Sequence, residues 1–205
     1  MDYEKIPLRE KINKTAESLE ARGIKTFIVE TAKEALGKVK ELIPAGAKVM
    51  NGSSTTLEQI GFVEYLKSGE HGWNNLHDAV LAEKDKDKQN QLRMQSSFAE
   101  YFLGSVHAIT ENGQTLIASA SGSQLAPYAF TAQNVIWVTS SNKIVATLED
   151  GLKRICEYSF PLEDKRMKGI GYPGSVLAKI LIFEREPAMM GRKITMILVN
   201  EKLGF

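Results

Sequence analysis

The alternation of apolar and polar positions predicts helices and strands that follow one another along the first quarter of the chain. Apolar residues at helical spacing predict two helices, and short runs of strand-forming residues predict two strands. The expected elements are helices at 8–22 and 31–43 and strands at 24–30 and 47–51. Gly23 and Pro44 stand where the two helices are expected to end. This strand–helix–strand order favours a parallel sheet covered by helices.

The same patterns predict the rest of the fold farther along the chain. Thr55-Thr-Leu-Glu58 has the form of a capping box, so a helix is expected from there toward Lys67. The other expected elements are a polar connection or solvated helix at 68–94, helices at 89–103 and 148–158, strands at 134–139, 179–183 and 193–199, and a long connection at 160–174. About seven strands and five or six helices, without an internal repeat or a clear linker, indicate one α/β domain over 1–205.

Residues 106–118 are expected to form a β-hairpin. Asn112-Gly113 suits a two-residue turn, because both central residues of such a turn must tolerate positive φ. β-branched and small apolar residues flank the turn at 106–110 and 115–118. The hairpin places Glu111 at the turn, where a carboxylate is either a solvated surface group or a catalytic one.

Two loops of small polar residues are candidate ligand-binding segments. Their candidate residues are Ser53, Ser54, Thr55, Ser121, Gly122 and Ser123. The first loop directly follows a strand, at the sheet edge where α/β proteins usually bind ligands. Its backbone N–H groups are expected at a helix N-terminus, which favours phosphate or carboxylate, and Thr55 is expected to cap that helix. The glycine of the second loop allows either the close approach of a ligand or a plain turn.

Three further side chains have both a chemical and a structural interpretation. Lys143, in an expected turn, would bring a cation to the same sheet edge, although a lysine in a turn is more often only solvated. His107 alternates with apolar residues in an expected strand, which favours a half-buried structural role over that of a base. Cys156 is expected on the apolar side of a helix with no cationic cluster nearby, which favours a core residue over a nucleophile.

Composition narrows the classes of function. A chain of 205 residues with 43% hydrophobic and 25% charged residues is typical of an ordinary globular domain. The net charge of +1 provides no electrostatic footprint for nucleic acid or an anionic membrane. One cysteine excludes an internal disulfide and a cysteine-built metal or iron–sulfur site, and the three histidines lack a metal-ligand spacing. Neither a nucleoside-triphosphate P-loop nor a dinucleotide fingerprint occurs, so no cofactor is expected.

The expected location is the cytoplasm. The N-terminal residues form no apolar segment of the kind found in a signal peptide. No apolar run approaches the ~20 residues that would span a bilayer.

Several ordered segments carry a resemblance to a known family. They are 54–61, 105–113, 121–122, 142–145, 148–150, 153–155, 161–166 and 191–205. Over 57–205 the chain resembles the LUD domain family, the lactate utilization proteins, and in particular lactate utilization protein C and its relatives. The resemblance implies a Rossmann-like three-layer α/β sandwich, with a mostly parallel sheet, an antiparallel hairpin and helices on both faces. It also implies membership of the broader group of CoA transferases, ribose-5-phosphate isomerase and glucosamine-6-phosphate deaminase.

The hairpin turn carries a second, more local resemblance. Thr110-Glu-Asn-Gly113 is similar to the Ser-Glu-Asn-Gly segment of CoA transferases, where the glutamate is the nucleophile. This similarity makes Glu111 the candidate catalytic residue and Asn112 a candidate ligand-binding residue. A carboxylate there would attack an acyl-CoA carbonyl and hold the acyl group as a mixed anhydride. Thr110 departs from the transferase pattern. The cysteine-rich segment of many relatives is also missing at 168–180, so any redox or metal role of those cysteines is not transferred.

The family resemblance implies a component of lactate or related 2-hydroxy acid utilization. Such a component would bind a small carboxylate and act with partner subunits that carry iron–sulfur clusters. One alternative is a stand-alone enzyme that acts on an acyl-CoA or a phosphorylated sugar through Glu111. Another is a non-catalytic ligand sensor or scaffold, since fold does not determine function. The apolar C-terminal strand permits a homodimer without requiring one.

Overall fold

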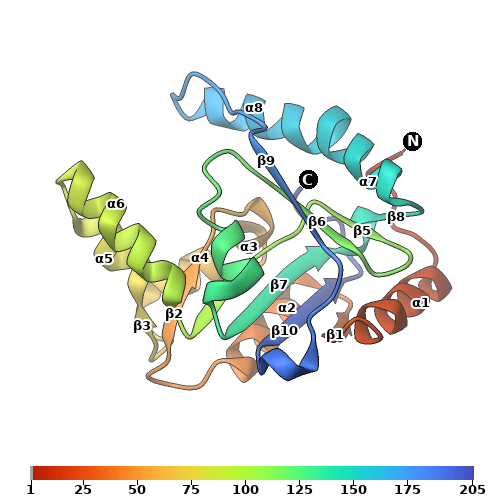
Figure 1. The fold of residues 1–205 in the computed structure, drawn as a ribbon, viewed down its shortest axis with the longest axis horizontal. Helices are drawn as coiled ribbons and strands as arrows, with labels where there is room; N and C mark the ends of the chain where they lie inside the picture. The colour runs from red at the N-terminus through yellow and green to blue at the C-terminus, as the bar shows by residue number, and fades with distance from the viewer. Residues whose placement is uncertain (1) are drawn as a thin grey trace.

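A computed structural model describes residues 2–205 (Figure 1). Six parallel strands form the main sheet. Their order is β1 (Ile24–Val29), β10 (Lys193–Val199), β7 (Asn134–Ser140), β4 (Tyr101–Gly104), β2 (Lys48–Asn51) and β3 (Asn74–Asn75). β7 and β10 are buried along almost their whole length, because helices or a second sheet cover both faces. The expected α/β architecture with a mostly parallel sheet is confirmed.

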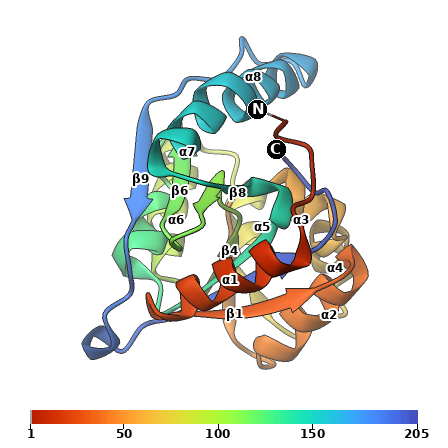
Figure 2. The ribbon, with the colours of Figure 1, turned by 90° about the vertical axis from the view of Figure 1, so that its right-hand side faces the viewer.

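Helices cover the main sheet on both faces (Figures 1 and 2). On one face pack α2 (Ala32–Leu42), α3 (Thr55–Gln59) and α4 (Phe62–Ser68). On the other pack α1 (Arg9–Glu20) and α5 (Leu76–Ala82), and α6 (Lys86–Gln95) lies against α5. None of the helices within 2–205 combines the length and apolarity needed to cross a bilayer.

A second, mixed sheet lies against the main sheet, on the face that α1 also covers. Its order is β8 (Ile144–Val145), β5 (Ala108–Thr110), β6 (Thr115–Ser119) and β9 (Lys179–Phe183). β5 and β6 form the expected antiparallel hairpin. On its other face packs α7 (Leu148–Arg154), which continues through a π-helical turn at Ile155–Ser159 into α8 (Phe160–Gly169). Phe183 of β9 and Trp137 of β7 meet edge to face with ring centroids 5.2 Å apart, so the two sheets share a hydrophobic core.

Three expected elements are wrong in type or extent. Residues 101–103 belong to strand β4 and not to a helix, because this apolar run is hydrogen-bonded between β2 and β7. Residues 160–169 form helix α8 and not a loop. That helix has no buried residues and is held by ion pairs such as Asp164–Lys168, so it has no apolar periodicity to reveal it. The helix expected from 55 to 67 is divided into α3 and α4 by Gly61, whose φ is 81°.

Two local expectations also need correction. The hairpin turn is not a two-residue turn, because only Gly113 has positive φ, at 84°. Gly113 N–H donates to Thr110 O at 2.8 Å and Thr110 N–H donates to Gln114 O at 2.9 Å, which defines a three-residue loop with a glycine bulge. Cys156 is exposed and not in the core, because the neighbouring Ile155, and Ser159 one turn later, take the inward positions of the π-helical turn.

Candidate functional site

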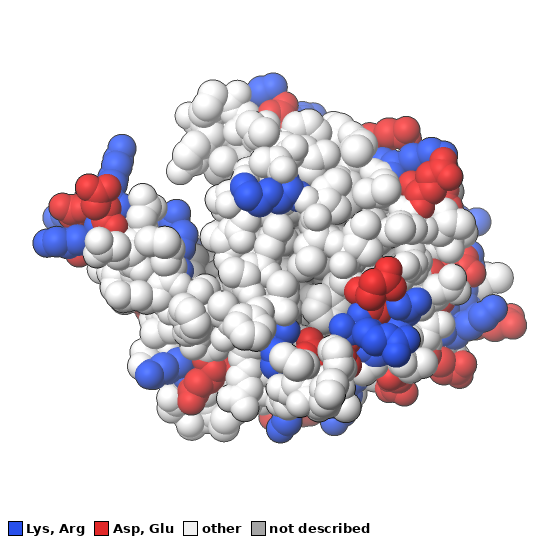
Figure 3. Space-filling model, in the orientation of Figure 1, with Lys and Arg blue, Asp and Glu red and all other residues white. Residues whose placement is uncertain are grey.

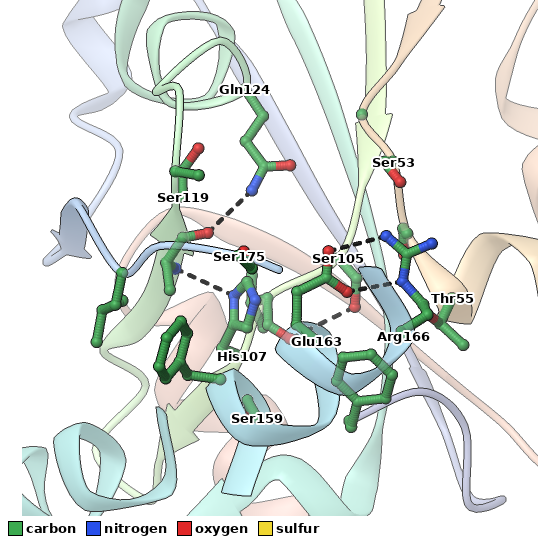
Figure 4. Close-up of a pocket in the computed structure, with 18 of the residues that line it drawn as sticks. Ser53, Thr55, Ser105, His107, Ser119, Gln124, Ser159, Glu163, Arg166 and Ser175 are labelled. Carbon is green, nitrogen blue, oxygen red and sulfur yellow. Dashed lines mark hydrogen bonds and ion pairs between the residues drawn. The ribbon is translucent and has the colours of Figure 1, made fainter. Parts of the chain in front are cut away.

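A pocket of about 280 Å³ opens at the carboxyl-terminal edge of the main sheet (Figure 4). The loops that follow β2, β4 and β7 form one part of its wall, and Phe205 beyond β10 adds to it. The end of β6 with the loop after it, and residues of α8, complete the enclosure. This is the sheet edge where parallel α/β folds usually bind ligands.

The structure brings most of the predicted site residues together in this pocket. Those that line it are Ser53, Ser54, Thr55, Ser121, Ser123 and Lys143. Glu111, Asn112 and Gly122 are not part of its lining. Figure 4 shows Ser119 and Gln124 on one side of the pocket and Ser53, Thr55 and Arg166 on the other. The two small-residue loops therefore face a common space.

The hairpin turn that carries Glu111 packs against helix α1. The Glu111 carboxylate lies 2.7 Å from Lys11 Nζ, and the carbonyl of Asn112 accepts a hydrogen bond from Arg22 Nε at 2.5 Å. A Cβ at Gly113 would lie 2.7 Å from the backbone of Ser18, so this glycine permits the close contact. The nucleophilic role of Glu111 stays a prediction.

The loop after β2 is held by a cap and by the second loop. Ser54 Oγ accepts the Leu57 N–H at 3.3 Å, so Ser54 caps α3, and the expectation that Thr55 does so is wrong. The difference is one residue in where the helix begins, which a Ser-Ser-Thr-Thr run does not specify. A Cβ at Gly52 would lie 2.8 Å from Gln124 Oε1. Gly52 therefore lets the two loops approach closely.

Lys143 is the most unusual side chain of the pocket. It stands at the end of a 3₁₀ turn, Ser141–Lys143, that follows β7, and only 2% of its surface is exposed. Its ammonium donates to Thr56 Oγ1 at 3.2 Å, Ser105 Oγ at 3.3 Å and Val106 O at 3.2 Å. Of the two interpretations of Lys143, the merely solvated lysine is therefore wrong, and its role in ligand binding stays a prediction.

All three oxygens around Lys143 are neutral. Within residues 2–205, no carboxylate forms an ion pair with this lysine. Burial and, secondarily, the charge of Arg154 hold the pKa of Lys143 well below its ordinary value. The pocket thus contains a basic group whose charge nothing in the described chain balances.

His107 lines the pocket between β4 and β5 and was not recognised as a site residue from the sequence. Its Nδ1 accepts the Ala118 N–H at 3.1 Å, so the neutral ring carries its proton on Nε2. Burial, followed by the charges of Lys143 and Arg154, lowers the pKa of His107 to about 3. The imidazole is therefore a neutral group that can donate a hydrogen bond from Nε2.

Two arginines near the pocket have different environments. Arg166 is paired with Glu163 through two hydrogen bonds of 2.7 and 2.8 Å, so its charge is balanced locally. Arg154 is fully buried, donates to His107 O and to Ser159 Oγ, and lies 5.1 Å from the centre of the Tyr158 ring. Arg154 fixes the backbone that carries His107 and adds a second buried cation. Both arginines lie in segments that carry the family resemblance, 153–155 and 161–166, but neither was predicted as a site residue from the sequence.

Residues 203–205 pass directly beside Lys143. Gly204 N–H donates to Gln59 Oε1 at 2.6 Å, and its φ is 59°. A Cβ at Gly204 would lie 2.3 Å from Thr56 Oγ1 and 3.2 Å from Lys143 Nζ. This contact, together with Phe205 in the pocket wall, makes the segment part of the site. Residues 203–205 belong to a segment that carries the family resemblance, 191–205, but no site residue was predicted there.

Comparison with known proteins agrees with the fold. The family model of the LUD domain matches residues 12–172. The chain belongs to the LUD domain family. A crystal structure described as a DUF162 family protein from Deinococcus radiodurans is similar to this LUD-domain chain, with a TM-score of 0.56 and 12% sequence identity. The alignment covers 94% of this chain and 99% of the other, and at that identity it shows a shared fold. No curated protein matches the sequence.

Within residues 2–205 there is no group of three or more histidine, cysteine, aspartate or glutamate side chains that could hold a metal ion. The chemistry available in the pocket is accordingly that of hydroxyls, an imidazole, a guanidinium–carboxylate pair and the amine of Lys143.

Proposed function

We propose that this LUD-domain protein binds a small carboxylate of the 2-hydroxy acid class, or its 2-oxo counterpart, as a component of lactate utilization. The observation that carries the proposal is Lys143, a buried basic group at the pocket without a carboxylate partner in residues 2–205. Burial without a counter-charge disfavours the protonated form of this lysine, and an anionic ligand would stabilise that form.

The rest of the pocket fits a ligand of this kind. The hydroxyls of Ser53, Thr55 and Ser105 and the Nε2–H of His107 supply hydrogen-bond donors for carboxylate and hydroxyl oxygens. A volume of about 280 Å³ lies at the small end of the range for ligand pockets, which favours a metabolite of a few carbon atoms. The family resemblance adds lactate as the ligand to test first.

Partner subunits with iron–sulfur clusters are the second part of the proposal. Oxidation of a 2-hydroxy acid releases two electrons, and the family resemblance assigns their transport to such partners. The face in Figure 3 has few charges across its centre, with acidic and basic side chains gathered toward its margins. Phe98 and Phe130 are about 70% exposed (71% and 68%) on turns joined by the Thr131–Ser97 hydrogen bond. Exposed aromatic side chains of this kind favour protein contacts.

We also propose a cytoplasmic location and one domain over 1–205.

Isothermal titration calorimetry with lactate, pyruvate and uncharged lactamide tests the binding proposal. We expect heat from the two acids and none from lactamide, because only a carboxylate supplies the negative charge that can pair with Lys143. Lys143→Met is expected to weaken binding at least tenfold, a loss of about 1.4 kcal/mol. Lys153→Met is the matched control, because Lys153 is exposed on α7 and pairs with Glu149. Equal affinity for lactamide and lactate would contradict the proposal.

Co-purification tests the partner proposal separately. The tagged full-length protein, isolated from its own cells without oxygen, is expected to retain proteins that show iron–sulfur absorption. Phe98→Asp combined with Phe130→Asp should release them and leave lactate binding unchanged. Retention of the same proteins by the double variant would exclude Phe98 and Phe130 from the docking surface.

A further inference from the structure

We infer that Lys143 forms a covalent imine with a 2-oxo acid held in the pocket. The inference rests on the proposed function for the class of ligand, and it adds a reaction to binding. Its starting point is geometric: Lys143 is the one lysine among residues 2–205 that lines the pocket. Its amine lies beside two hydroxyl groups and not against a carboxylate.

The charges around Lys143 favour the reactive form of the amine. The ionisable groups near it are His107, Arg154 and the Arg166–Glu163 pair. His107 is neutral, Arg154 is cationic and Glu163 is occupied by Arg166, so no anionic group balances the charge of an ammonium here. The pKa of Lys143 is lowered by its burial and by Arg154. A neutral lysine amine is the nucleophile in imine formation.

The hydrogen-bond shell of Lys143 suits both the amine and the ammonium. Val106 O can only accept a hydrogen bond, whereas the Thr56 and Ser105 hydroxyls can accept or donate. When the amine is neutral, one hydroxyl can turn and donate to the nitrogen lone pair. The two hydroxyl oxygens lie 3.4 Å apart, and Ser105 Oγ is also 3.4 Å from Thr139 Oγ1. This cluster provides a short path for the protons that the reaction moves.

The reaction balances without an oxidant or reductant. The lysine nitrogen attacks the C2 carbonyl carbon, and the carbonyl oxygen takes up a proton to give a carbinolamine. Loss of that hydroxyl with a second proton releases one water and leaves a protonated imine. In total, a lysine ammonium and a ketone give an iminium ion and water, so charge is conserved. The carboxylate of the 2-oxo acid, one carbon away, then supplies the negative charge that the pocket lacks.

Reductive trapping tests this inference. The intact protein is incubated with pyruvate and sodium cyanoborohydride, and the adduct is located by peptide mapping with mass spectrometry. We expect one reduced pyruvate adduct, on Lys143, and its yield should fall at least tenfold in the presence of excess lactate. Lactate alone should give no adduct, because it has a hydroxyl group at C2 in place of the ketone that the amine attacks. Exposed Lys153 serves as an internal control for non-specific modification.

Two variants and a binding measurement complete the test. Lys143→Arg keeps a cation but cannot form an imine, and it should lose the adduct; circular dichroism establishes that it is folded. If Lys143→Arg does not fold, the peptide map of the protein without a substitution still identifies the lysine that carries the adduct. Pyruvate that binds by calorimetry but leaves Lys143 unmodified would overturn the imine and leave the proposed function standing. Absence of binding by both lactate and pyruvate would overturn the proposed function together with the imine.

Discussion

At the scale of single residues, Glu111 has a structural role, its ion pair with Lys11, and a predicted chemical role, and substitutions can tell the two apart. Its ion pair with Lys11 is partly exposed, with 29% and 47% of the two side chains accessible, and such a pair contributes less than about 1 kcal/mol. We expect Glu111→Gln and Lys11→Gln to lower the free energy of unfolding by similar small amounts in urea titrations. If Glu111 is the nucleophile predicted from the sequence, only Glu111→Gln abolishes turnover of an acyl-CoA substrate. Unchanged turnover in that variant would exclude the nucleophilic role.

His107 makes stability depend on pH. Its pKa is about 3 in the folded protein and near its ordinary value of 6.5 in the unfolded chain. Between these values the unfolded chain binds more protons, so the free energy of unfolding falls as the pH is lowered from 6.5 toward 3. We expect His107→Gln to flatten this decline, as measured by urea unfolding at a series of pH values. An unchanged slope in the variant would show that His107 titrates normally in the folded state.

At the scale of elements, the cap of α3 distinguishes two neighbouring residues. Ser54 Oγ accepts the Leu57 N–H, whereas Thr55 is the first residue inside the helix. Ser54→Ala should therefore lower the free energy of unfolding by about 1 kcal/mol, and Thr55→Ala should change it by less than about 0.5 kcal/mol. Urea titrations of the ligand-free proteins measure both. A larger loss for Thr55→Ala would mean that the helix begins one residue later.

The elements also show what the sequence can and cannot predict. Strands β7 and β10 were predictable because their apolar runs are short and contain β-branched residues, which favours a buried strand over a helix. α8 was not, because its helical state depends on ion pairs along its surface and on its continuity with α7. The loops of the pocket were predictable from their position after strands. The position of Lys143 at the sheet edge was predicted, but its burial was not. That burial results from residues 203–205 and the loop after β4, which are distant from Lys143 in sequence.

At the scale of the whole molecule, the two sheets are expected to unfold together. One hydrophobic cluster contains Ile109, Ile117 and Phe183 of the second sheet with Trp137 and Met196 of the main sheet. Neither sheet can lose its partner without exposing these side chains, which favours a single cooperative transition. Trp137 reports directly on this junction, since its ring is fully buried and packs against Phe183.

Fluorescence of a Trp73→Phe variant, in which Trp137 is the remaining tryptophan, should follow the same urea transition as far-ultraviolet circular dichroism. Phe183→Ala should lower the free energy of unfolding by about 3 kcal/mol or more, because it opens a cavity between the sheets. Both signals should shift to lower urea by the same amount. Ile170→Ala is the matched control, since Ile170 is 57% exposed and should leave the midpoint almost unchanged. A fluorescence transition that precedes the circular dichroism transition would instead mean that the second sheet detaches first, and the pocket between the sheets would then open before the main sheet unfolds.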